Sequence, residues 1–259
     1  MEAMQPNEFR EQVRLGTFRN VTTDACLGYA QANLVVVPKS LAFDFFLFCQ
    51  RNPRPCPIIE VTEPGDYHPR FSAPGGDLRT DLPKYRVFKN GEIIAEPCDI
   101  LQYWDEGSVA FILGCSTNFD YILRKSNVQY RYVGDHTTSL ECKPAGIFHG
   151  TMVVSTRIFK TSHDAVRAVQ ITSRNLAAHG PPVHIGNPED IGIEDLYHPD
   201  MFSFNEDIQP VQTSEITMSW ACGVTPQIVA KSSKVPFMIS HFPGHMFVTD
   251  KRSEALSAF

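Results

Sequence analysis

Hydrophobic runs of strand length alternate with segments of helical periodicity along most of the chain. The first such pair is the β-branched run ANLVVV, residues 32–37, followed by Leu41, Phe45 and Phe48 at helical spacing. The helical pattern stops at Asn52-Pro53, because a proline disfavours the helical conformation of the residue before it. We therefore expect a strand that leads into a buried helix.

Two later segments share one design, in which an apolar strand runs into a cysteine-bearing turn and then into a helix. In VAFILGCSTNFDYIL the run 109–113 precedes Cys115, and in TMSWACGVTPQIV the run 217–221 precedes Cys222. Thr225 followed by proline is typical of a helix start, since the first helical position needs no backbone N–H. Both cysteines are therefore expected at the ends of strands.

Turn residues mark further boundaries. The segment YRVFKNGEII, residues 85–94, places two strand-like arms around Asn90-Gly91, the pair that a tight hairpin turn favours. Residues 58–62 form another expected strand. Helices are expected to start at Thr161 and Asn187, where a capping residue precedes acidic residues.

The alternation of strands and helices favours an α/β fold, with a mostly parallel sheet sandwiched by helices. The middle third is richer in irregular segments, so we expect a smaller inserted α+β domain over residues 126–214. Residues 1–125 and 215–259 would then form the main domain. In such folds ligands bind beyond the carboxyl ends of strands, which is where the two cysteine turns lie.

Composition excludes several classes of protein. The 259 residues are 42% hydrophobic and 20% charged, as in an ordinary globular protein. No apolar run approaches the roughly 18 residues of a membrane span, and the start MEAMQPNEFREQ has no apolar core of a secretion signal, so we expect a cytoplasmic protein without a membrane partner. The net charge of −6, without a basic stripe, argues against nucleic acid and leaves a small anionic substrate and a homo-oligomer open.

The cysteine turns are candidate sites for binding a carboxylate. Ser116 and Thr225 lie at expected helix N-termini, where free N–H groups attract anions, although such residues commonly only cap their own helix. Cys115 and Cys222 are expected to have stabilised thiolates there, the alternative being inert buried thiols. The seven cysteines occur singly, which disfavours a disulfide framework or a zinc ribbon.

Basic side chains supply a second kind of carboxylate contact. Arg157 is unusual because it lies inside the apolar run MVVSTRIF, whereas Lys39 follows a strand and Arg79 lies in GGDLRTD. An arginine fork can grip a carboxylate at both oxygens. The alternative for each is an ion pair at the surface.

Histidines complete the set of candidates. His149, His241 and His245 could move protons near neutral pH. The spacing of HFPGH resembles a zinc pair, but the proline and glycine prevent the helix that would aim both rings at one metal, so no metal is expected. The nucleotide-binding glycine motifs are absent from the sequence, and we expect no cofactor.

Several blocks in fixed order carry a family resemblance. VAFILGCS, PAGIFHG, PVHIGNPEDIGI, WACGVTPQ and HFPGHMFVTD, together with ANLVVVPKSLAFDFFLFCQRNPRPCPIIEVTEPGD and APGGDLRTDLPKYRV, resemble the hydro-lyases of the D-glutamate cyclase family. The resemblance runs from about Gly28 to Asp250 and implies a lyase that removes water. In the characterised animal members the reaction closes D-glutamate to 5-oxo-D-proline. Those members are mitochondrial and carry a second large domain. The helix start TNFD of this chain also departs from the Phe-Ser-Phe-Glu-like sequence of relatives in the family.

The resemblance transfers no catalytic residue, so the expected site comes from the chemistry. Arg157 or Arg79 and the turn at Ser116 would hold the carboxylates of the substrate. His149 and His245 would be acid and base, with Cys115 close by. Lys39, Cys222, Thr225 and His241 are further candidates for substrate contacts. Two alternatives stay open, a racemase or epimerase with Cys115 facing Cys222, and a non-catalytic protein that binds amino acids.

Overall fold

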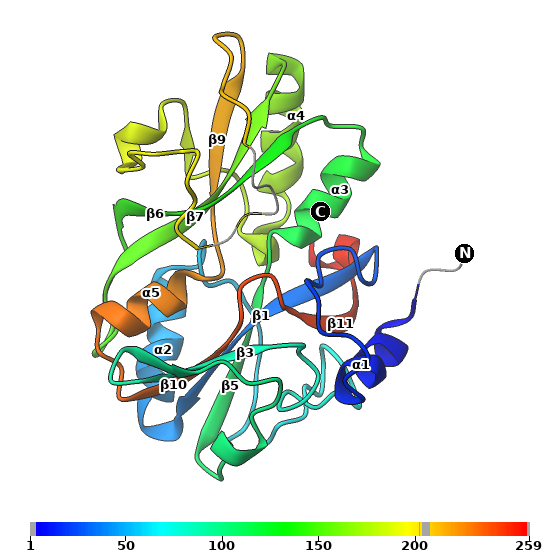
Figure 1. Cartoon of the computed structure of the whole chain (residues 1–259), viewed down its shortest axis with the longest axis vertical. Coiled ribbons are helices and arrows are strands. Elements are labelled where there is room, and N and C mark those ends of the chain that lie inside the picture. The colour runs from blue at the N-terminus through cyan, green and yellow to red at the C-terminus, as the bar shows by residue number, and fades with distance from the viewer. Residues whose placement is uncertain (1–3, 202, 204–207, 258–259) are drawn as a thin grey trace.

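The computed structural model describes residues 4–201, 203 and 208–257, and these form two antiparallel sheets with helices packed against them (Figure 1). The helices are α1 Pro6–Arg14, α2 Lys39–Arg51, α3 Thr117–Lys125, α4 Ser162–Ser173 and α5 Thr225–Ser232, with 3₁₀ turns at Leu101–Tyr103, Leu176–Ala178, Pro188–Ile191 and Ser253–Leu256. Among these residues no helix combines the length and the apolar character that crossing a membrane requires.

The larger sheet has seven strands in the order β2-β5-β1-β10-β3-β4, with β11 also paired to β1. Their bounds are β1 Tyr29–Pro38, β2 Ile58–Val61, β3 Tyr85–Lys89, β4 Glu92–Ala95, β5 Ser108–Gly114, β10 Phe237–His241 and β11 Phe247–Arg252. The smaller sheet has the order β6-β7-β9-β8, with β6 Arg131–Glu141, β7 Thr151–Phe159, β8 His184–Ile185 and β9 Ile216–Ala221.

The expected parallel sheet is wrong, because every strand pairing in both sheets is antiparallel. β1 and β2 do run in the same direction and are joined through α2, as the sequence indicated. A later strand, β5, lies between them and runs antiparallel to both. The alternating pattern of strand and helix therefore predicted β1, α2 and β2, but it did not predict that β5 lies between the two strands.

The continuous hydrophobic run of β1 reflects burial on both of its faces and not a parallel sheet. Val35 and Val37 pack on one face with Phe45 of α2, while Leu34 and Val36 pack on the other. Such two-sided burial is usual for parallel sheets, which explains the wrong prediction of a parallel sheet.

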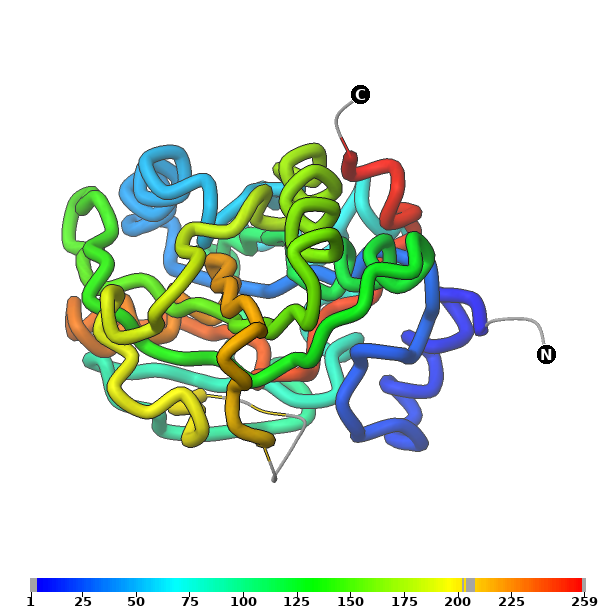
Figure 2. The backbone as a smooth tube through the Cα atoms, turned by 90° about the horizontal axis from the view of Figure 1, so that it is seen from above, coloured from blue at the N-terminus to red at the C-terminus, as the bar shows by residue number. Residues whose placement is uncertain are grey.

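Seen from above, α2 and α4 lie along one side of the molecule, and residues 186–201 follow the opposite side (Figure 2).

β10 and β11 occupy the same edge of β1, one after the other. Ser240 lies opposite Val35, and Phe247 lies opposite Ala32. The chain thus advances by seven residues from Ser240 to Phe247 but passes only three residues of β1. Four residues are therefore in excess, and the segment 242–246 leaves the sheet at the middle of β1. This interruption is the main part of the sequence HFPGHMFVTD.

The two sheets meet at the turns that follow β5 and β9. A Cβ atom on Gly223 would lie 1.8 Å from Nδ2 of Asn33, and one on Gly114 would lie 1.6 Å from the carbonyl oxygen of Ala177. Only glycine permits such close contacts. β9, residues 216–221, belongs to the smaller sheet, and the division into residues 1–125 plus 215–259 and residues 126–214 stays a prediction.

Local predictions are confirmed at several boundaries. Asn90 and Gly91 join β3 to β4 with positive φ angles of 51° and 81°. The side chain of Thr161 accepts a hydrogen bond from the amide of Asp164 at the start of α4, and Asn187 caps the 3₁₀ turn after it in the same way. These signals are local, so they survive the change in sheet direction.

Candidate active site

A buried cavity of about 50 Å³ lies where the two sheets meet. Its walls come from the centre of β1, the turn after β5 with the start of α3, β6, the turn after β9, and the 242–246 interruption. The lining residues are Thr23, Asn33, Cys115, Ser116, Thr117, Asp120, Tyr132, Asp135, Cys222, Val224, His241, Gly244 and Met246. The two cysteine-bearing turns, which share one strand-turn-helix pattern in the sequence, therefore line the same cavity.

Both thiols of this cavity are neutral at physiological pH. Burial raises the pKa of Cys222 well above its ordinary value, and the nearby carboxyl of Asp135 raises it further. Burial also raises the pKa of Cys115, although the hydroxyl and amide of Thr117 oppose the rise. This direction is opposite to the one expected for a thiol at a helix N-terminus, because the loss of water outweighs the helix dipole here.

Asp135 on β6 is the carboxyl group whose chemistry the cavity changes most. Burial raises its pKa to about 6, while hydrogen bonds from Tyr132 and Cys222 and the charge of Arg157 oppose a larger rise. The hydroxyl of Tyr132 donates to Oδ1 at 2.7 Å. A carboxyl with this pKa can both accept and donate a proton near neutral pH, as a general acid or base must.

Arg157 on β7 binds another residue of the cavity wall. Its Nε and Nη2 donate to the two carboxylate oxygens of Asp120 at 2.7 and 2.5 Å, and Nη1 donates to Ser155 Oγ at 3.0 Å. The guanidinium is 0% exposed. Burial opposes the charge, but the interactions with Asp120 are stronger and raise the pKa of Arg157. Its fork therefore holds Asp120 and is not free to grip a substrate.

Aromatic rings surround the same guanidinium. Phe119, Tyr130, Tyr132 and Trp220 lie with their ring centres 4.8, 5.9, 5.3 and 5.3 Å from it. The hydroxyl of Tyr130 also donates to Oδ1 of Asp120 at 2.9 Å. The rings exclude water from the guanidinium, and its two hydrogen bonds, together with that of Tyr130, fix Asp120 in the wall of the cavity.

His241 at the end of β10 has one ring nitrogen that no other described residue binds. Its Nδ1 lies 3.3 Å from the amide nitrogen of Leu34, 3.4 Å from the carbonyl oxygen of Leu34 and 3.3 Å from Ser240 Oγ, so it accepts or donates there according to the tautomer. Burial lowers the pKa of His241 to about 4, so the ring is uncharged at neutral pH. Nε2 is buried and has no hydrogen-bond partner among the described residues, and the same is true of Thr23 Oγ1. Both residues line the cavity.

The structure brings four of the expected site residues into the cavity lining, namely Cys115, Ser116, Cys222 and His241. His245 is buried beside it with Nδ1 3.0 Å from the carbonyl of Pro243 and its ring edge against Phe242. His149 is exposed, and its amide donates to Ser233 Oγ. The two histidines expected as acid and base are therefore not paired across one site.

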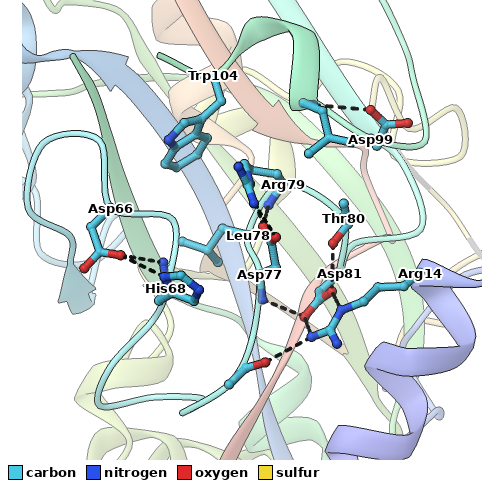
Figure 3. Close-up of polar contacts among 12 residues, drawn as sticks. Arg14, Asp66, His68, Asp77, Leu78, Arg79, Thr80, Asp81, Asp99 and Trp104 are labelled. Atoms are coloured by element: carbon cyan, nitrogen blue, oxygen red, sulfur yellow. Dashed lines mark hydrogen bonds and ion pairs between the residues drawn. The ribbon is translucent and has the colours of Figure 1, made fainter. Parts of the chain in front are cut away.

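The remaining candidates lie elsewhere. Lys39 is exposed at the start of α2. Thr225 is buried, with its hydroxyl donating to the carbonyl of Cys222 at 2.7 Å and accepting from the amide of Val153 at 3.0 Å, so it holds the turn after β9. Arg79 binds Asp77 with its fork (Figure 3). It also stacks on the ring of Tyr67, whose centre is 3.2 Å away.

Sequence reasoning missed Asn33, Asp120, Tyr132 and Asp135. Asp120 is the acidic residue of the first turn of α3, a position that is typical of helix capping. Instead its carboxylate binds Arg157. Tyr132 and Asp135 lie in a strand with no motif around them, and only the folded chain shows that both line one cavity, where Tyr132 is half-buried and Asp135 buried.

The fold and the cavity describe a protein of two packed antiparallel sheets with ionisable groups around one buried polar hollow. The profile of the D-glutamate cyclase family matches residues 109–250, which include every residue of the cavity wall except Thr23 and Asn33. The chain belongs to this family.

Relatives from bacteria match over nearly the whole chain. Those from Geobacillus kaustophilus, Stutzerimonas stutzeri and Bacillus subtilis are 48%, 46% and 46% identical, each cover 98% of this chain, and are themselves covered over 97%, 96% and 99%. Each bears the name "Putative hydro-lyase". A nitrogen repressor-like protein from Methanococcus jannaschii aligns over 94% of this chain and 98% of its own, but a TM-score of 0.40 at 9% identity carries no argument.

Proposed function

We propose that this protein is a hydro-lyase that acts on a small amino or carboxylic acid in the buried cavity, and that D-glutamate closing to 5-oxo-D-proline is its reaction. The single observation that carries the proposal is Asp135, a buried carboxyl with a pKa of about 6 in the cavity wall. The names of the relatives support the class of reaction, and the family supports the substrate.

The reaction requires protons to move between two groups of one substrate. The ammonium group of glutamate loses two protons and its nitrogen bonds to the side-chain carboxyl carbon. One oxygen of that carboxylate leaves and takes up both protons, which gives water. A single protein group near its own pKa can carry each proton in turn, so Asp135 is suited to this shuttle. It takes the role first expected for His149 and His245.

Neutral donors hold the charges of the substrate in this proposal. The N-terminus of α3, at Ser116 and Thr117, and the unpartnered Nε2 of His241 face the cavity, and its described lining includes no lysine or arginine. Nε2 donates in the tautomer that carries its proton there. A buried, unpartnered donor gains a full hydrogen bond when a carboxylate arrives. Arg157 does not touch the substrate in this proposal. It holds Asp120 in place, and its positive charge lowers the pKa of Asp135 against the effect of burial.

The test is to incubate the purified protein with D-glutamate and with L-glutamate, and to follow the products by chiral chromatography. We expect 5-oxo-D-proline from the D-isomer alone. Asp135→Asn should lower kcat by about 10²-fold or more, the usual contribution of a general acid–base group. Asp77→Asn makes the same replacement of a carboxyl by an amide at the partly exposed partner of Arg79, and it should leave kcat unchanged. Equal turnover by wild type and Asp135→Asn would remove Asp135 from the mechanism.

A racemase or epimerase is the second candidate, because Cys115 and Cys222 line the same cavity. A two-thiol enzyme takes an α-proton with one thiolate and returns a proton from the other thiol. The raised pKa of both thiols works against this reading. In D₂O, a racemase would exchange the α-proton of glutamate without releasing water, and Cys115→Ser would abolish that exchange. In the cyclase reaction, glutamate would keep its α-proton.

A further inference from the structure

An open groove of about 570 Å³ adjoins the buried cavity. It runs between Thr23-Asp24 on one side and the segment from Asp120 of α3 to Tyr132 on the other, and we refer to it as the entrance groove. Thr23, Asp120 and Tyr132 line both hollows. The entrance groove therefore shares part of its wall with the cavity.

One face of α3 connects the two hollows. Thr117, Asp120 and Arg124 are spaced i, i+3 and i+7, so they share this face of the helix. Thr117 lies at the cavity, Asp120 at the boundary and Arg124 in the groove. Helical side chains lean toward the helix N-terminus, so Arg124 leans toward the cavity.

Arg124 has a partner that it can give up. Of the described residues that line the entrance groove, it alone carries a positive charge. Its Nη1 lies 3.0 Å from Oδ1 of Asp24, and the two side chains are 46% and 66% exposed. Ion pairs this exposed are weak, because water solvates both charges. By contrast Arg157 is fully buried and committed to Asp120.

We propose that Arg124 is a docking residue for carboxylates at the mouth of the site, where an incoming acid displaces Asp24 before it enters the cavity. The class of ligand, a small dicarboxylate, rests on the function proposed above. The chain carries a net charge of −6 and repels anions overall, so a local cation at the mouth raises their concentration there. Arg124 acts on capture and not on the proton transfers.

This role separates KM from kcat. Arg124→Gln should raise KM for D-glutamate about twofold to fivefold at low salt, the range of one exposed charge interaction, with kcat unchanged. Asp24→Asn should lower KM, because the competing carboxylate is gone. Salt should raise KM in the wild type and have little effect in Arg124→Gln. Arg174→Gln, an equal change of charge at an exposed residue outside the groove, is the matched control.

Binding of glutarate, a dicarboxylate without the reacting amine, keeps the test independent of turnover. Calorimetry should show weaker binding to Arg124→Gln than to the wild type, and unchanged binding to Arg174→Gln. That result would support the docking residue even if D-glutamate proved not to be the substrate. Equal glutarate affinity for wild type and Arg124→Gln, or no glutarate binding by the wild type, would overturn the proposal whatever the enzyme assay shows.

Discussion

Two arginines of this protein make the same contact in different surroundings. Arg157 and Arg79 each hold an aspartate with both arms of the guanidinium fork, and each lies against an aromatic ring. Arg157 is 0% exposed, whereas the side chains of Arg79 and Asp77 are 23% and 21% exposed. The sequence made both candidates for holding substrate, and the fold uses both on the chain itself. The difference in burial decides how much each ion pair contributes to the stability of the fold.

The largest expected effect is the loss of the buried charge. Arg157→Gln leaves the carboxylate of Asp120 without its partner in a cage of rings, so the free energy of unfolding should fall by about 3–5 kcal/mol. Urea unfolding measures this. The double variant Arg157→Gln/Asp120→Asn removes both charges and should recover part of the loss. A single-variant loss below about 1 kcal/mol would mean that the buried pair behaves like an exposed one.

A smaller effect is expected from the carboxyl that faces Arg157. Asp135 has a pKa of about 6 in the fold against an ordinary 3.8, so its folded form binds the proton more tightly than the unfolded chain does. The resulting stability is present below about pH 4 and is lost as pH rises through 6, in total about 3 kcal/mol. The wild type should lose most of this, about 2.5 kcal/mol, relative to Asp135→Asn between pH 4 and pH 7.

The interaction with Arg157 sharpens that pH experiment. The positive charge of Arg157 lowers the pKa of Asp135 against the effect of burial. In Arg157→Gln the pH window in which stability is lost should therefore move upward, provided that the variant is folded by circular dichroism. A difference between wild type and Asp135→Asn that stays flat from pH 4 to pH 7 would contradict the raised pKa.

The smallest effect belongs to the exposed fork. Arg79→Gln removes the pair with Asp77, whose two side chains are partly exposed, and the stacking on the half-buried ring of Tyr67. The free energy of unfolding should fall by about 1 kcal/mol or less, and kcat on D-glutamate should not change. A large loss of turnover with normal stability would show that the loop of Arg79 reaches the substrate.

Local elements of this fold could be predicted, and their assembly could not. The hairpin at Asn90-Gly91 and the two strand-turn-helix segments depend on neighbours in sequence, so their signals can be read directly. The direction of the large sheet depends on β5 entering between β1 and β2 from about fifty residues away along the chain. No periodicity within β5 reports which strand it will join.

The site shows the same division. Cys115, Ser116, Cys222 and His241 could be predicted because glycine turns and strand ends mark them. Asp135 could not, because its useful pKa is produced by burial and not by its residue type. Likewise nothing in the sequence separates an exposed histidine from one beside a cavity, and His149 proved to be exposed.

The four surplus residues between β10 and β11 give this protein a place where its sequence can change independently of its fold. Each flanking strand is paired to β1 on its own, so the sheet keeps its alignment whatever length joins them. Gly244 and Met246 of the joining segment nevertheless form part of the cavity wall. Insertions, deletions or a grafted loop here would reshape the pocket while the strands keep their pairing, which makes residues 242–246 the natural target for changing which ligand the cavity accepts.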